Sequence, residues 1–345
     1  MSTSRLMLKG SALQTLDAVV AIVVGMITLP LMQKSLGSEL YGVWILVGGF
    51  TAFLYIFDFG FAASIIQGVA SSVAAKDSKK TNSIINTAFC IYTILSISIL
   101  LLVTVLSLTY KPEISNVISG IELSWIIFIV GLSIAIEFPF KALAGLPQAY
   151  LRFDKGAINR IIVKLVGLVG TIILLHCGFK LVPIALWSLA MSIFSNLLFL
   201  SVAKAVFSEL RLSRKYIDIN LARHLFKYSS WSFLIDINNL IKKRVDVFFV
   251  AGYISLGAVS VYYVSVRLVE YAVQLLFKGL NLGLPILTAN ASQNENGKFS
   301  ENLQILNRVN VYFSVIAFLF FYIFGRSVIY YWMVVNLILV QLMKC

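Results

Sequence analysis

Long apolar runs dominate the chain, and most of them have the length of a membrane crossing. A helix needs about 20 apolar residues to cross about 30 Å of hydrocarbon. The runs lack the alternation of membrane β-strands, so helices are the structure that satisfies the backbone in lipid. The pattern predicts an all-α, polytopic integral membrane helix bundle with about ten transmembrane helices, at residues 12–33, 40–66, 81–108, 121–146, 157–178, 181–205, 224–251, 256–289, 301–325 and 327–343.

The composition supports a membrane protein and excludes several other classes. Hydrophobic residues fill 59% of the 345 positions and charged residues only 12%, which excludes a soluble enzyme. The net charge of +13 does not indicate nucleic-acid binding, because so apolar a chain has no solvated face for a basic footprint. The three cysteines form no spaced cluster, so neither a disulfide framework nor a metal site is predicted.

Basic residues fall mainly in every second connection between the predicted spans. The N-terminus, the C-terminus and the connections on their side carry fourteen Lys and Arg residues, whereas the opposite connections carry only Lys34, Lys111, Lys180 and Arg326. Because Lys and Arg are retained on the cytoplasmic side, this asymmetry predicts that both termini are cytoplasmic.

The longest polar connection divides the chain into two predicted lobes. Shifting the sequence by about 220 residues aligns Asp17 with Asp236 and places similar segments side by side, which predicts pseudo-repeated lobes. The second lobe is expected to be short, either naturally or because the reading frame was cut. The predicted parts are an N-terminal lobe of six helices at 1–205, a cytoplasmic basic linker at 206–223 and a C-terminal lobe of about four helices at 224–345.

Many charged residues lie inside the predicted spans. A charge near the bilayer centre costs at least about 2.5–3.5 kcal/mol, so such residues are either functional or paired. Their spacing places several of them in polar stripes along single helix faces. The eight cations and six anions of this set are Asp17, Asp58, Glu137, Lys141, Lys164, Asp236, Lys242, Lys243, Arg244, Asp246, Arg267, Glu270, Lys278 and Arg308.

Two interpretations of these stripes remain open. Glu137 with Lys141, and Arg267 with Glu270, have spacings that permit ion pairs within one helix. Alternatively, the stripes line a hydrophilic cavity between the lobes, and the two surplus cations favour an anionic ligand such as phosphate or pyrophosphate.

Three carboxylates are candidates for ion coupling. Asp17, Asp58 and Asp236 lie on polar stripes within spans. A carboxylate in a low dielectric holds its proton more tightly, which coupling to H⁺ would use, and Na⁺ is the alternative coupling ion. Beyond such an ion, no cofactor is predicted.

Short segments of the sequence resemble a known family. Leu36-Gly37, Tyr41-Gly42-Val43-Trp44 and Leu54-Tyr55-Ile56-Phe57-Asp58-Phe59-Gly60 resemble the first two helices of polysaccharide biosynthesis proteins. These are the Wzx-type O-antigen flippases of the multidrug/oligosaccharidyl-lipid/polysaccharide (MOP) exporter superfamily. Asp246-Val247-Phe248-Phe249 looks like the segment that opens the second lobe of that family.

The resemblance implies a function. The substrate would be an undecaprenyl-pyrophosphate-linked oligosaccharide, such as an O-antigen or capsule repeat unit, flipped across the bacterial inner membrane by alternating access. Implied partners are membrane lipids and, in lipopolysaccharide biosynthesis, a polysaccharide polymerase and a chain-length regulator. The residues expected to bind the head group are Lys141, Lys164, Lys243, Arg267, Lys278 and Arg308.

Three rival hypotheses remain. A MATE-like exporter of cationic small molecules would need an acidic cavity. A membrane-embedded polymerase or acyltransferase commonly needs a large extracytoplasmic loop, and the outward connections here are short, so no catalytic residue and no enzyme activity are predicted. An inactive remnant is the third.

Overall fold

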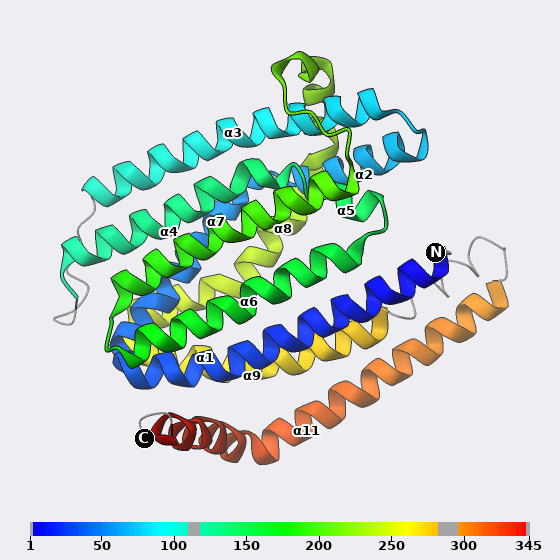
Figure 1. Ribbon diagram of the computed structural model, residues 1–345. Helices are drawn as coiled ribbons and strands as arrows, with labels where there is room; N and C mark the ends of the chain where they lie inside the picture. Colours follow the sequence, from blue (N-terminus) through cyan, green and yellow to red (C-terminus); the bar gives the residue numbers. More distant parts are fainter. Residues whose placement is uncertain (1–2, 110–117, 282–295, 343–345) are drawn as a thin grey trace. The chain divides into compact units, whose positions relative to one another are not determined.

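The computed structural model describes residues 3–109, 118–281 and 296–342, and these residues form a bundle of helices (Figure 1). The all-α class is therefore confirmed. In the described part of the chain, seven helices are long and apolar enough to cross a membrane. By their contacts the described residues divide into two compact units. One unit comprises the residues up to Asp17 and from Met32 to Ser260, and the other comprises Ala18–Leu31 and the residues from Val261 onward.

The helices of the structure do not begin and end where the first two predicted spans do. Helix α1 (Thr3–Leu54) runs through both of them, with one non-helical residue, Gly37, at φ 80° and ψ 166°. Glycine adopts this backbone conformation because it has no Cβ. The predicted span at 40–66 is itself broken, since the short 3₁₀ helix η1 (Tyr55–Asp58) separates α1 from α2 (Phe61–Ala74).

Five further helices complete the central part of the first unit. Helix α3 packs along α4, α4 and α6 each pack against α7, and α2 contacts α3 and α5 (Figure 1). Their buried core is aliphatic and aromatic, and it includes Ile85, Phe138 and Leu146. These helices span Ser78–Thr109 (α3), Gly120–Lys141 (α4), Gly145–Ala149 (α5), Phe153–His176 (α6) and Leu181–Val206 (α7).

The connection after α7 is tied to α3 by side-chain amides. Asn82 donates to the carbonyl of Glu209 (3.0 Å) and accepts from the amide of Arg211 (2.8 Å). One helical turn later, Asn86 donates to the carbonyl of Arg211 (2.8 Å) and accepts from the amide of Ser213 (2.7 Å). The two asparagines therefore hold residues 209–213 as the edge of a strand would.

The predicted linker is shorter than expected. After the 3₁₀ helix η2 (Arg214–Tyr216), α8 (Ile219–Tyr253) begins inside the range 206–223 that was predicted as linker. Asp218 caps α8, because its carboxylate accepts from the amide of Asn220 (2.8 Å). Helix α8 then packs against α2, α3 and η1. The division into an N-terminal lobe at 1–205 and a C-terminal lobe at 224–345 stays a prediction.

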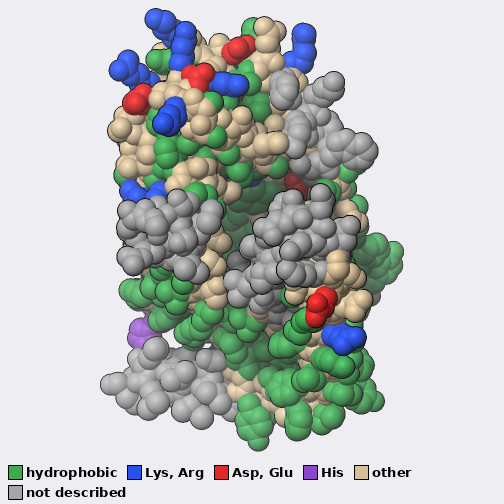
Figure 2. Space-filling view, turned by 90° about the vertical axis from the view of Figure 1, so that its right-hand side faces the viewer, with side chains coloured by type: hydrophobic (Ala, Val, Ile, Leu, Met, Phe, Trp, Pro, Cys, Tyr) green, Lys and Arg blue, Asp and Glu red, His purple; other side chains and the backbone are tan. Residues whose placement is uncertain are grey.

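Basic side chains gather at the end of the first unit that carries this connection. Figure 2 shows Lys and Arg side chains with a few carboxylates at the top of the view. The cytoplasmic location of this end stays a prediction. The exposed basic residues of the α2–α3 turn and of the connection are Lys76, Lys79, Lys80, Arg211, Arg214 and Lys215.

The second unit contains α9 (Leu256–Asn281) from Val261 onward, α11 (Asn296–Leu342) and the middle of α1. Helix α11 is continuous where the sequence predicted two spans, 301–325 and 327–343. Pro30 has no N–H, so it leaves the carbonyl of Met26 without its helical partner. The indole N–H of Trp332 donates to that carbonyl (2.8 Å).

Candidate functional site

Two helix breaks place Asp58 next to Lys141. Asp58 ends η1, and Phe59 (φ 49°) and Gly60 (φ 72°) then take left-handed conformations before α2 begins. Lys141 is the last residue of α4, which contains Pro139 near its end. The anion thus lies at the positive end of α2 and the cation at the negative end of α4, so both helix dipoles favour the pair.

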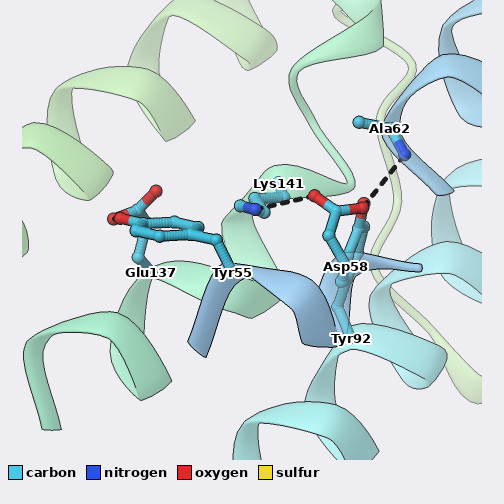
Figure 3. A network of polar contacts seen from close by, with 6 residues as sticks. All are labelled: Tyr55, Asp58, Ala62, Tyr92, Glu137 and Lys141. Atoms are coloured by element: carbon cyan, nitrogen blue, oxygen red, sulfur yellow. Dashed lines mark hydrogen bonds and ion pairs between the residues drawn. The ribbon is translucent and has the colours of Figure 1, made fainter. Parts of the chain in front are cut away.

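The Asp58 carboxylate has three hydrogen-bond partners. Its Oδ2 accepts from Lys141 Nζ (2.7 Å), and its Oδ1 accepts from the Tyr92 hydroxyl (2.9 Å) and from the amide of Ala62 in the first turn of α2 (3.2 Å) (Figure 3). Tyr92 is fully buried. These partners replace the water that a carboxylate loses inside a membrane-spanning segment, which lowers the free-energy cost of its burial.

Lys141 also lies against aromatic rings. Its Nζ is 4.6 Å from the ring centroid of Tyr55 and 4.5 Å from that of Phe138, within the range of cation–π attraction. The Tyr55 hydroxyl in turn donates to Oε2 of Glu137 (2.8 Å) (Figure 3). The spacing of Glu137 and Lys141 permits an ion pair within α4, but each of these side chains bonds to the η1 segment instead.

Lys141 lines two pockets of the first unit. One has a volume of about 320 Å³ and is also lined by Asp58, Asp236, Asn239 and Arg244. The other has a volume of about 410 Å³, lies between α4, α6 and α7, and is also lined by Glu137 and Arg160. Polar side chains at membrane depth must face protein or water, and these pockets are where they do so.

A second ion-pair cluster joins α1 to α6. Asp17, only 8% exposed, accepts from Arg160 Nε (2.7 Å) and from Lys164 Nζ (2.5 Å). Lys164 Nζ also donates to the backbone carbonyl of Asp17 (3.2 Å). Two cations share this one carboxylate, so the cluster carries one unbalanced positive charge.

Arg267, a further predicted site residue, lies on α9 in the second unit. Arg267 donates to Glu270 (2.6 Å) and to the Tyr263 hydroxyl (2.8 Å) on its own helix, so the predicted pair of Arg267 with Glu270 is confirmed. Arg308 is exposed on α11, which belongs with Arg267 to the second unit. The side chains of Lys243 and Lys278 lie outside the described residues.

Taken together, the two pockets have walls of balanced charge. Their charged walls comprise three cations and three carboxylates. The predicted basic cavity between the lobes stays a prediction. Asp58 pairs directly with Lys141, whereas Arg160 shares Asp17, which lines neither pocket, with Lys164. Among the described residues, no group of three or more His, Cys, Asp or Glu side chains is arranged to hold a metal ion. The charged residues that line the pockets are Asp58, Glu137, Lys141, Arg160, Asp236 and Arg244.

Sequence reasoning did not name several residues that line these pockets or bond to their walls as site residues. Tyr92 follows no polar stripe, and only its position beside η1 reveals that it bonds to Asp58. Arg160 lies four residues before Lys164, and this helical spacing was the signal for it. The polar face of α7 carries no charge and was not singled out; it comprises Ser188, Ser192, Ser195 and Asn196.

A protein-family comparison identifies the chain. Residues 31–339 match the model of a family described as "Polysaccharide biosynthesis protein". The chain belongs to this family. A search of curated protein sequences finds no match to this polysaccharide biosynthesis protein.

Solved structures show which fold this member of the family adopts. An inward-facing multidrug resistance MATE family transporter of the MOP superfamily matches with a TM-score of 0.67 and 12% identity, over 90% of this chain and 72% of that one. Its outward-facing form matches with a TM-score of 0.67 and 12% identity, over 96% and 74%. The polysaccharide biosynthesis protein is thus a multi-pass membrane protein with the MATE transporter fold.

A third solved structure with this fold is described by the polarity of its binding pocket. It is a MOP superfamily transporter from Pyrococcus furiosus, matched with a TM-score of 0.63 and 12% identity over 96% of this chain and 74% of that one. That transporter is described as having a binding pocket of reverse polarity, which suggests a different function for it. At these identities the likeness establishes the fold alone.

Proposed function

We propose that this protein flips a polyprenyl-pyrophosphate-linked oligosaccharide, such as an O-antigen or capsule repeat unit, across the bacterial inner membrane. The observation that carries the proposal is the position of Lys141, in the wall of two polar pockets inside a bundle of membrane-spanning helices. Membership of a polysaccharide biosynthesis family supports the choice of cargo. The polyprenyl tail stays in lipid while the pyrophosphate enters the pockets.

The ion pairs provide a means of coupling. Lys141 is bonded to Asp58, so a pyrophosphate that binds this ammonium has to compete with the carboxylate. A proton or Na⁺ taken up at Asp58 removes that competition and releases Lys141 for the phosphate oxygens. Lys164 and Arg160 are released from Asp17 in the same way.

The rest of the cycle follows from the same proposal. The substrate is loaded from the cytoplasmic side, where both termini lie, and the lobes rock to open the cavity to the outer face. Arg267, Lys278 and Arg308 of the second unit and Lys243 of the first remain candidates for binding the head group. Asp236, in the wall of the smaller pocket, is the further candidate for the coupling ion. A polymerase and a chain-length regulator would take the flipped product.

Complementation of a flippase-null strain tests the proposal. We expect Lys141→Ala to lower surface polysaccharide at least tenfold, because a charge-assisted hydrogen bond to the pyrophosphate is lost. Lys204→Ala is the matched control, since Lys204 is an exposed lysine on α7 and lines neither pocket. Normal export by Lys141→Ala, at equal protein levels in the membrane, would contradict the proposal.

An exporter of cationic small molecules is the second candidate. A cavity with surplus cations would repel cationic small molecules. The charges of the pocket walls are balanced, and Asp58 and Asp236 line the smaller pocket, so these walls favour an exporter of cations more than a cationic cavity would. The two functions predict opposite phenotypes. An exporter of cations protects cells from cationic dyes and leaves surface polysaccharide unchanged, whereas a flippase restores the polysaccharide and does not protect.

A further inference from the structure

The larger pocket of the first unit has one wall of uncharged polar groups. Helix α7 presents to it a face of four side chains, whose spacing places them on successive turns. None of these side chains has a role in the ion pairs described above. The four are Ser188, Ser192, Ser195 and Asn196.

Asn196 is the informative member of this face. It is only 6% exposed, and its amide nitrogen has no hydrogen-bond partner. A buried donor without an acceptor destabilises a fold, and native proteins retain few of them. Because Asn196 lines the pocket, an acceptor on a ligand in the pocket would satisfy it.

The serines of this face supply hydrogen-bond acceptors, which complement the donor of Asn196. The Ser188 hydroxyl donates to the carbonyl of Ala185 (2.7 Å), and the Ser192 hydroxyl donates to the carbonyl of Ser133 on α4 (3.1 Å). Their protons are used in these bonds, so their oxygen lone pairs remain as acceptors for a ligand. On the facing wall, the Glu137 carboxylate is a further acceptor and the Arg160 guanidinium a further donor.

A set of interleaved donors and acceptors fits hydroxyl groups best. A phosphate only accepts hydrogen bonds and an ammonium ion only donates them, whereas each hydroxyl of a sugar does both. Phe140, Val163 and Met191 line the same pocket and can cover the apolar C–H faces of a sugar ring. The volume of about 410 Å³ lies in the range of small-molecule sites, roughly 300–1,000 Å³.

We propose that this pocket binds the sugar residue attached directly to the pyrophosphate of the lipid carrier, with Asn196 and Ser195 as specificity-determining residues. This inference rests on the proposed function and extends it. Lys141 lines this pocket and the smaller one, so a pyrophosphate bound at Lys141 has its first sugar beside α7. The face of α7 then selects the glycan, and Lys141 holds the group common to all such carriers.

Binding of two lipids to the purified protein in detergent tests the inference by native mass spectrometry. The probes are undecaprenyl pyrophosphate and the same lipid carrying one N-acetylglucosamine. We expect the wild-type protein to bind the sugar-bearing lipid about tenfold more tightly. Asn196→Leu and Ser195→Ala should each remove most of this preference and leave the affinity for undecaprenyl pyrophosphate unchanged. Ser201→Ala, an exposed serine on α7 outside the pocket, should keep it.

A stability measurement separates ligand binding from a structural role. Asn196→Leu removes a buried unpaired donor, so its melting temperature should equal or exceed that of the wild type. If Asn196→Leu melts at a lower temperature than the wild type and loses affinity for both lipids, Asn196 has a structural role. The preference of Ser195→Ala for the sugar-bearing lipid then decides whether the α7 face binds the sugar. Equal binding of both lipids by the wild type overturns the inference and leaves the proposed function intact. Failure of the wild type to bind either lipid overturns the proposed function as well.

Discussion

The pairing of Asp58 with Lys141 depends on more than the attraction of two charges. Their side chains are 14% and 18% exposed, so both ions have lost most of their water. Desolvation of that kind can exceed the Coulombic gain unless further hydrogen bonds are made. Tyr92 and the amide of Ala62 supply them for the carboxylate, and two aromatic rings flank the ammonium group. The pair is therefore held in one geometry and is still accessible from a pocket.

A double-mutant cycle measures this coupling. Asp58→Asn and Lys141→Met should each lower the free energy of unfolding by about 1.5–3 kcal/mol, because each leaves the other charge desolvated and unpaired. The double variant should cost clearly less than the sum, since neither charge remains. Denaturant titration in detergent gives these energies, and Lys204→Met is the control at an exposed lysine. Strict additivity would mean that the two groups do not interact.

Individual residues were predictable where a charge had to be explained. Asp17, Asp58 and Lys164 stood out because lipid does not tolerate them, and the structure places each in an ion pair. Their partners were harder to predict, because helical spacing shows only neighbours on the same helix. Lys141 pairs across helix breaks with Asp58 rather than with Glu137. Asn196 was not predicted, because the charged residues of the spans were the signal that was followed and Asn196 is uncharged.

At the scale of elements, two asparagines on α3 fix the connection between α7 and α8. Four helical residues advance about 6 Å, and two residues of an extended strand advance about 6.6 Å. Asn82 and Asn86 can therefore bond to Glu209, Arg211 and Ser213 in register. The basic linker is therefore attached to the first unit, and the sequence did not indicate this attachment.

Limited proteolysis tests this attachment. Replacing both Asn82 and Asn86 with Ala removes their four hydrogen bonds to the linker, so trypsin should cut at the linker's basic residues at least tenfold faster. Asn220→Ala is the matched control, because Asn220 is an exposed asparagine just beyond the linker. An unchanged cleavage rate in the double variant would mean that other contacts hold the linker.

The ends of a helix were predictable only where the length of its apolar run determines them. The bilayer sets that length, so the spans at 157–178 and 181–205 nearly coincide with α6 and α7. Hydropathy does not register backbone geometry, and it therefore missed the break at η1 inside the predicted span 40–66. It also separated α11 into two spans, because Arg326 interrupts an apolar run that the helix passes through.

At the scale of the molecule, the charged residues that line the two pockets of the first unit are balanced when counted together. A net charge of +13 for the whole chain coexists with balanced pocket walls, because many basic residues lie at exposed helix ends and in the linker. Under the proposed function, a pyrophosphate binds Lys141 after the Asp58 carboxylate has been neutralised. We propose that this competition for Lys141 links uptake of a coupling ion to binding of the substrate.

Transport in proteoliposomes tests the central claim most directly. Purified protein is reconstituted with an undecaprenyl-pyrophosphate-linked oligosaccharide, and movement of the glycan between leaflets is followed with and without an ion gradient. We predict gradient-dependent movement by the wild type and a loss of at least tenfold in Lys141→Ala, with Lys204→Ala unaffected. No movement by the wild type, or equal rates for the wild type and Lys141→Ala, would contradict the proposed role of Lys141 and its pockets.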